Sequence, residues 1–112
     1  MWCNVGFAKD FNYTCILDVH FKLYDNKDWL NQDIEFNIYN LGNVLKIFNK
    51  SQKKYRPDLK ITVNNSTEVI ASIDFTDNIN SFVLNKNTLY AKFSNMYYDD
   101  RGGGEYGIGK CN

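Results

Sequence analysis

A two-residue alternation runs from Thr14 to Tyr24, and it constrains the fold more than any other feature of the sequence. The apolar positions on one side are Cys15, Leu17, Val19, Phe21 and Leu23. Most of the residues between them are polar, and successive side chains of an extended strand point to opposite faces of a sheet. The pattern therefore predicts a long strand with one buried and one solvent-exposed face, which is typical of an antiparallel sheet.

Shorter alternating runs predict further strands along the chain. They are Ile34–Ile38, Leu59–Val63, Val69–Phe75, Phe82–Leu84 and Leu89–Phe93. Polar, asparagine-containing runs separate the last four of them, and such runs favour turns.

The apolar period changes after residue 40. Leu41, Val44, Leu45 and Phe48 fall at i, i+3, i+4 and i+7, the spacing of one face of an amphipathic helix. We therefore expect a helix from Leu41 to about Lys53 that buries Leu45 and Phe48 against the sheet. The predicted fold is α+β, an antiparallel sheet of five or six strands with one amphipathic helix packed on one face.

The composition shifts to Asp, Gly and Glu near residue 99, so we predict a single domain over 1–98 and a glycine-rich C-terminal tail over 99–112. From Gly104 to Lys110 this tail matches all but the last position of the phosphate loop G-x-x-x-x-G-K-[ST]. A working loop needs a helix that starts at the lysine and a hydroxyl side chain that binds magnesium. Cys111 and Asn112 supply neither, so we expect no nucleotide and no other cofactor.

Residues that could support catalysis are scarce. His20 is the only histidine and shares a strand face with Asp18, and we expect a cross-strand surface contact there rather than an acid–base pair. Three cysteines, Cys3, Cys15 and Cys111, are too few and too scattered to predict a zinc site or a disulfide framework, and we expect Cys15 to be a buried free thiol. The sequence thus predicts no enzyme, no catalytic residue and no metal.

The chain starts without the basic and apolar regions of a signal peptide, so we expect a cytoplasmic protein. Its 13 basic and 13 acidic residues balance, and the position of the charges is more informative than their sum. Acidic residues and aromatic side chains occur together in two segments, which indicates binding to a basic protein, because aromatic side chains often anchor interfaces. The predicted partner-binding residues are Tyr97, Tyr98, Asp99, Asp100 and Tyr106, with a second group at Asp25, Asp28 and Trp29.

A basic stretch leaves another kind of partner open. It includes Lys50, Lys53 and Lys54, and Tyr55 follows directly. Basic side chains next to an aromatic ring can hold a nucleic-acid backbone. The alternative expectation is therefore DNA or RNA binding at these lysines.

The stretch from Asp33 to Val63, DIEFNIYNLGNVLKIFNKSQKKYRPDLKITV, resembles small immunity proteins of bacterial polymorphic or contact-dependent toxin systems. The resemblance lies in a strand, a helix and a second strand in this order. It implies a cytoplasmic inhibitor that binds a cognate toxin, such as a nuclease, and blocks its active site or substrate cleft. The alternative function is a phage or mobile-element protein that binds nucleic acid or inhibits a host defence system.

Overall fold

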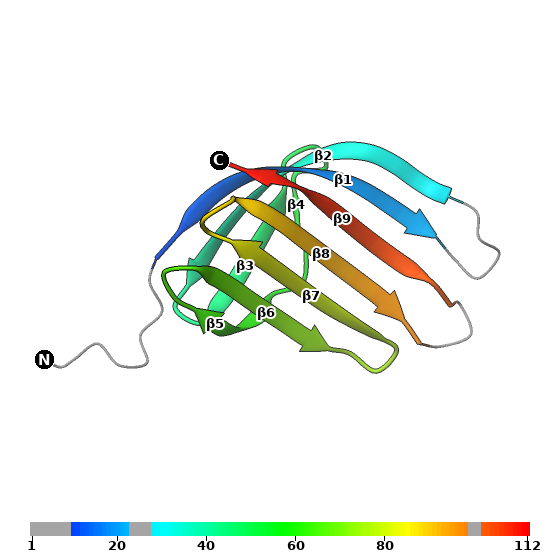
Figure 1. The fold of residues 1–112 in the computed structure, drawn as a ribbon. Helices are drawn as coiled ribbons and strands as arrows, with labels where there is room; N and C mark the ends of the chain where they lie inside the picture. Colours follow the sequence, from blue (N-terminus) through cyan, green and yellow to red (C-terminus); the bar gives the residue numbers. More distant parts are fainter. Residues whose placement is uncertain (1–9, 23–27, 99–101) are drawn as a thin grey trace, which may run out of the picture.

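The computed structural model describes residues 10–22, 28–98 and 102–112, and for residues 28–30 it describes the backbone alone. Its nine strands are β1 (Asn12–Lys22), β2 (Asp28–Leu41), β3 (Val44–Asn49), β4 (Lys54–Tyr55), β5 (Leu59–Asn64), β6 (Glu68–Asp74), β7 (Asn78–Asn85), β8 (Tyr90–Tyr97) and β9 (Gly104–Cys111). The strands pair antiparallel in the order β2-β1-β9-β8-β7-β6-β5-β3-β4. A further pairing of β2 with β3 closes eight strands into a barrel, and the short β4 is added beside β3 (Figure 1).

The predicted α+β fold is wrong, because the described residues contain strands and no helix. Where a helix was expected from Leu41 to Lys53, the chain forms the end of β2, the whole of β3 and the turn before β4. Leu41 pairs with Val44, so Gly42 and Asn43 form a two-residue hairpin loop. Gly42 has a φ of 59°, and glycine at the first position of such a loop permits this left-handed conformation.

The apparent helical face combines residues from both sides of β3. Leu45 and Ile47 are buried inside the barrel, whereas Val44 is 37% exposed and Phe48 is half-buried on the outside. Apolar residues on both sides of one strand can reproduce the i, i+3, i+4 spacing of a helix. The expected burial is thus confirmed for Leu45 and wrong for Phe48.

Inward-facing side chains fill the barrel with a continuous core. Its buried members are Cys15, Leu17, Val19, Ile34, Phe36, Ile38, Leu45, Ile47, Leu59, Ile61, Val69, Ala71, Phe82, Leu84, Ala91, Phe93 and Cys111. The alternation predicted from Thr14 to Tyr24 is confirmed as β1 up to Lys22, and Leu23 and Tyr24 lie outside the described residues. The other predicted strands coincide with β2 and β5–β8, except that Phe75 and Leu89 lie just outside β6 and β8. The barrel interior is therefore packed by side chains, as expected for a barrel of this strand number.

The last part of the chain, assigned from the sequence to a glycine-rich tail, contains β9, which pairs with β1 on one side and β8 on the other. Two of its glycines leave room for neighbours. A Cβ atom on Gly107 would lie 2.3 Å from the Phe93 ring, and one on Gly109 would lie 2.0 Å from the Ile16 carbonyl oxygen. Glycine thus allows Phe93 to fill the interior and β1 to approach β9 closely.

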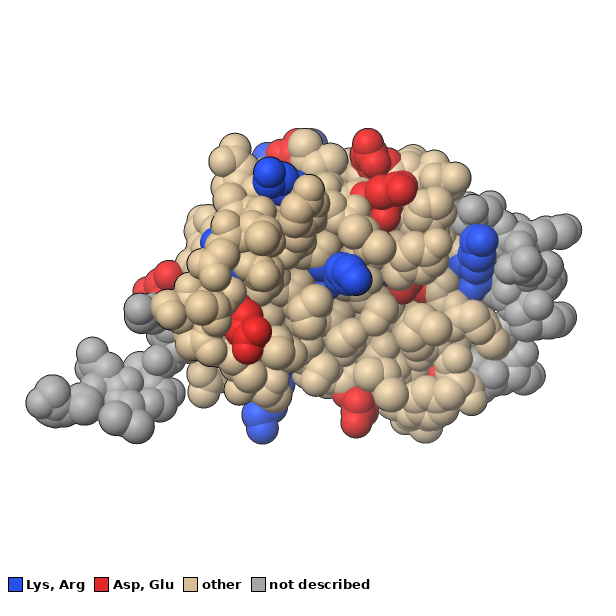
Figure 2. Space-filling view, viewed as in Figure 1, with Lys and Arg blue, Asp and Glu red and all other residues tan. Residues whose placement is uncertain are grey.

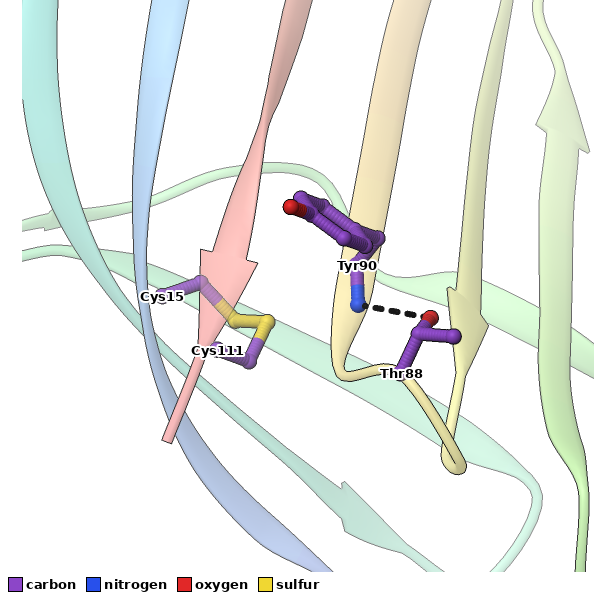
Figure 3. Close-up of a disulfide and its surroundings, with 4 residues drawn as sticks. All are labelled: Cys15, Thr88, Tyr90 and Cys111. Atoms are coloured by element: carbon purple, nitrogen blue, oxygen red, sulfur yellow. Dashed lines mark hydrogen bonds between the residues drawn. A yellow bond between two sulfur atoms is a disulfide. The ribbon is translucent and has the colours of Figure 1, made fainter.

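A disulfide between Cys15 and Cys111 joins β1 to β9 at one end of the barrel, which we call the disulfide end (Figure 3). The expectation of a free Cys15 thiol is wrong, because the register of the two strands places these cysteines opposite each other with Cα atoms 3.9 Å apart. Thr14 and Asn112 exchange two backbone hydrogen bonds of 3.1 and 2.8 Å next to the bridge. The first and last strands are therefore held together both covalently and by the sheet. Cys3 lies outside the described residues.

An ion pair crosses the interior near the opposite end, which we call the polar end. The Arg56 Nη2 atom lies 2.7 Å from Glu105 Oε1, and the two side chains are 18% and 16% exposed. Arg56 lies between β4 and β5, half-way around the barrel from β9. Its guanidinium also lies 4.7 Å from the centre of the Phe93 ring. The pair thus connects opposite walls of the barrel.

Candidate protein-binding site

The outer surface of β7, β8, β9 and β1 carries the largest group of exposed apolar side chains that the strand registers bring together. Seven of them are 38–57% exposed: Ile16, Ile79, Val83, Tyr90, Met96, Tyr106 and Ile108. We call this surface the apolar face. Figure 2 shows it from outside as a mostly uncharged surface with few Lys, Arg, Asp or Glu side chains. Extended exposed apolar patches are uncommon on monomeric proteins and mark interaction sites.

The registers arrange the apolar face in rows across the strands. Ile79 on β7 lies opposite Met96 on β8, at the edge nearer the polar end. In a parallel row, Val83, Lys92 and Ile108 follow one another on β7, β8 and β9. Between these rows lie small residues and Tyr106.

A shallow hollow of about 240 Å³ opens in the middle of the apolar face. It is lined by Ser81, Val83, Lys92, Phe93, Ser94, Tyr106, Gly107 and Ile108. Ser81 and Ser94 face each other across β7 and β8, and their hydroxyl oxygens are 2.7 Å apart. Because these hydroxyls satisfy each other and their side chains are small, they leave space between the larger apolar residues. The hollow has the size of a large side chain.

Basic groups predominate on this surface, where Asp18 on β1, opposite Ile108, is the one carboxylate among the described outward residues. The outward residues of β7, β8 and β9, which the structure describes in full, include Lys92 and Lys110 and no carboxylate. Lys92 lines the hollow, and the Lys110 Nζ atom lies 5.6 Å from the centre of the Tyr90 ring. The surface therefore favours acidic groups at its centre and at the Lys110 side.

Tyr106 connects the apolar face to β1. Its ring stacks on that of His20 with centroids 5.1 Å apart and an interplanar angle of 12°. The His20 Nε2 atom in turn lies 3.2 Å from Asp18 Oδ2. The predicted cross-strand surface contact is confirmed by the stacking of His20 on Tyr106, which holds the Tyr106 ring in a defined position.

The predicted partner-binding residues separate in the structure. Tyr106 belongs to the apolar face, but Tyr97 packs its ring edge-on against Phe21, with centroids 6.3 Å apart. Tyr98 is 58% exposed, and its hydroxyl donates a hydrogen bond to the Phe75 carbonyl oxygen. Asp25, Asp99 and Asp100 lie outside the described residues, and Asp28 and Trp29 are described by their backbone in β2 alone.

Sequence reasoning missed most of the apolar face. Ile79, Val83, Met96 and Ile108 are aliphatic residues dispersed over three strands, and only the registers bring them to one surface. Ile108, an apolar residue between two glycines, was a usable signal that this segment is ordered and not a mobile tail.

Carboxylates neutralise much of the basic stretch that predicted nucleic-acid binding. Lys46 Nζ lies 2.9 Å from Asp58 Oδ1, and Lys50 Nζ lies 2.7 Å from Glu35 Oε2. Arg56 is directed into the barrel toward Glu105. The stretch therefore presents fewer unpaired positive charges than its sequence indicates.

Within the described ranges, no three His, Cys, Asp or Glu residues are grouped so that they could hold a metal ion. The same part of the chain contains no helix of the length and hydropathy needed to span a membrane. Comparisons of the chain with family models, curated proteins and solved structures found no match.

Proposed function

We propose that this chain is a non-catalytic protein-binding module that holds a partner protein on the apolar face. The observation that carries the proposal is the hollow between Val83, Tyr106 and Ile108, in the middle of a surface formed by four adjoining strands. Interface hot spots are well-packed pockets that receive one anchoring side chain and are surrounded by residues that exclude water. The hollow supplies the pocket, and the surrounding apolar residues supply the rim.

The partner presents an apolar or aromatic anchor with a carboxylate beside it. The anchor fills the hollow, and the carboxylate pairs with the Lys92 ammonium at its edge. A second carboxylate near the rim pairs with Lys110. Such complementary charges accelerate association and select the partner more than they raise affinity.

A second copy of this chain is a poorer occupant of the apolar face. Two-fold association of identical faces places the same residues of both copies in one interface. Each copy then brings Lys92 and Lys110 to the interface against a single carboxylate, Asp18 on β1, which already contacts His20. A different protein with acidic groups avoids this repulsion.

The proposed function is broader than that of an immunity protein. The resemblance to immunity proteins depended on a helix between Asp33 and Val63, and this stretch contains strands and turns instead. Inhibition of a toxin remains one way in which a protein-binding module can act. The basic partner expected at Asp25, Asp99 and Asp100 stays a prediction, because these residues lie outside the described part of the chain.

Co-purification with matched variants tests the proposal. The tagged chain is expressed in its source cells as the wild type, as Ile108→Glu and as Leu41→Glu. Ile108 is 46% exposed on the apolar face, and Leu41 is 60% exposed at the end of β2, outside it. We expect one protein to co-purify in near-equimolar amount with the wild type and with Leu41→Glu, and to be lost with Ile108→Glu. Circular dichroism verifies that both variants are folded.

Binding of the purified pair then tests the assigned chemistry. Ile108→Ala should weaken binding by about 1–2 kcal/mol, mainly through faster dissociation. Lys92→Glu should slow association, with an effect that decreases as salt screens the charges. A partner that Ile108→Glu retains but Asp99→Lys with Asp100→Lys loses would overturn the proposal in favour of the acidic segments. Binding of bare nucleic acid that is lost with Lys53→Glu and Lys54→Glu would contradict it as well.

A further inference from the structure

The polar end of the barrel contains a second hollow, of about 490 Å³, on a different part of the molecule from the apolar face. It is lined by Pro57, Phe75, Thr76, Asp77, Asn78, Asn80 and Asn95. Ligand sites of about 300–1,000 Å³ are common in proteins, and the mouths of β-barrels are one of their usual places. Its volume and position are those of a small-molecule site.

Amide side chains form the inner side of this hollow. Asn80, Asn95 and Glu105 are cross-strand neighbours on β7, β8 and β9, and all three face the barrel interior. Asn80 is 5% exposed, and Glu105 is held by the ion pair with Arg56. Polar residues in the inward row of a packed barrel are expensive to bury unless they are hydrogen-bonded. The presence of Asn80, Asn95 and Glu105 in the inward row therefore indicates that polar side chains at this end of the barrel have a binding role.

Hydrogen bonds fix two of these amides. Asn80 Nδ2 donates to Asn78 Oδ1 at 2.8 Å, and Asn78 Nδ2 donates to Asp77 Oδ1 at 2.6 Å. Asn95 differs, because its Oδ1 atom is buried and has no hydrogen-bond partner in the described part of the chain. A buried acceptor without a donor destabilises the fold. A donor that reaches Asn95 from the hollow that this residue lines would satisfy the acceptor.

The outer side of the hollow is apolar and held in place. Phe75 is 38% exposed there, and Pro57 approaches from the segment before β5. The Phe75 N–H donates to the Asn78 carbonyl oxygen at 2.8 Å, and the Phe75 carbonyl accepts from the Tyr98 hydroxyl. These bonds fix the turn between β6 and β7, so the aromatic wall is formed before a ligand arrives.

We propose that this hollow binds a saccharide, meaning a neutral ring that carries several hydroxyl groups. One hydroxyl donates to Asn95 Oδ1, and others exchange hydrogen bonds with the amides of Asn78 and Asn80, since an amide offers both donors and an acceptor. The apolar C–H groups of the ring lie against Phe75 and Pro57. The Asp77 carboxylate and the acceptor on Asn95 disfavour an anionic ligand. The lining has the mixture of apolar walls and few convergent polar groups that defines small-ligand sites.

Nuclear magnetic resonance titration tests this proposal independently of the protein-binding function. The probes are the methyl glycosides of glucose, galactose, mannose and N-acetylglucosamine at millimolar concentration, added to the ¹⁵N-labelled chain. The variants are Asn95→Leu, which removes the acceptor, and Phe75→Ala, which removes the aromatic wall. Leu41→Ala is the control, because Leu41 is the last residue of β2, near the disulfide end and away from the hollow.

At least one glycoside should shift the backbone signals of Phe75, Asn78 and Asn95 and leave those of the disulfide end unchanged. Asn95→Leu should weaken this binding by about tenfold or more, as expected for the loss of one buried hydrogen bond. It should not lower the melting temperature, which separates a binding role from a structural one. The proposal is overturned if no glycoside shifts these signals, if Asn95→Leu binds as tightly as the wild type, or if an organic amine such as methylammonium shifts them and the glycosides do not.

Discussion

Removal of the Cys15–Cys111 disulfide should cost this barrel a large part of its stability. The bond joins residues 96 positions apart, so it closes almost the whole chain into one loop. A cross-link over roughly 100 residues removes enough chain entropy from the unfolded state to be worth about 4.7 kcal/mol at 25 °C. Domains of this size have unfolding free energies of about 5–15 kcal/mol. Loss of the bridge therefore removes from a third to nearly all of the stability.

Urea unfolding of matched variants measures this contribution. The reference carries Cys3→Ala, so that Cys15 and Cys111 are its only cysteines, and the test variant adds Cys111→Ala. With a urea slope near 2 kcal/mol per molar, the expected loss lowers the unfolding midpoint by about 2 M. Reduction of the reference with dithiothreitol should produce a shift of similar size and leave the test variant unchanged.

Thiol titration provides the independent control. The unfolded, unreduced reference should contain no reactive thiol, and it should gain two after reduction, one from each cysteine of the bridge. Two reactive thiols before reduction would show that the bridge does not form. A formed bridge whose reduction leaves the midpoint unchanged would refute the entropic argument itself.

Three further perturbations test the packing and the surface. Gly109→Ala should destabilise the barrel by about 1–3 kcal/mol or more in urea unfolding, because the new Cβ meets the β1 backbone, which cannot move without separating the two strands; a neutral result would show that β1 and β9 do not approach so closely. Leu45→Ala should lower the unfolding free energy by about 2–5 kcal/mol, because Leu45 is fully buried, and Phe48→Ala should lower it distinctly less, because Phe48 is half-buried. A larger loss for Phe48→Ala than for Leu45→Ala would support the helix expected from the sequence instead. The hydrogen bond with Tyr55 raises the pKa of the Tyr39 hydroxyl in the folded protein. The stability that this hydrogen bond contributes should be complete below about pH 10 and lost as the pH rises through the raised pKa. The unfolding free energies of Tyr39→Phe and the wild type should therefore converge in strong alkali, and a difference that grows with pH would contradict this role of the hydrogen bond.

The sequence predicted the antiparallel strands better than it predicted their closure. Alternation identified β1 because its inward side is apolar throughout, from Cys15 to Phe21. It failed on β9, whose inward positions are Glu105, Gly107, Gly109 and Cys111. Gly107 and Gly109 carry no side chain because Phe93 and the β1 backbone occupy the space in front of them, and Glu105 is polar, so Cys111 is the single apolar side chain among these four positions. When neighbouring strands supply the atoms that fill the core in front of a strand, the sequence of that strand shows no alternation of apolar and polar residues.

The helix error and the missed disulfide have related causes. At β3 the outward Val44 and Phe48 are apolar, so the period of two was hidden, and the Gly42–Asn43 turn was absorbed into the expected helix. Cys15 and Cys111 become neighbours only through the β1–β9 register, which no spacing along the chain reveals. Tyr106 was predicted as a binding residue from its residue type alone, but the surface to which it belongs could be recognised only from the β1–β9 register.

The position of β9 between β1 and β8 has a consequence for how the protein is made. These two strands cannot find their shared neighbour until residues 104–111 have left the ribosome, so the barrel cannot close before β9 is synthesised. Until then β1 and β8 each carry an edge of unpaired backbone groups, the kind of edge that pairs with other chains and causes aggregation. Because Thr14 and Asn112 are already hydrogen-bonded, a circular permutant that joins the two ends with a short linker and opens at the Gly42–Asn43 turn would synthesise β1 and β9 in succession. In that permutant the β1–β9 pairing, which joins Cys15 to a residue 96 positions away in the present order, becomes a local contact, and local contacts form faster.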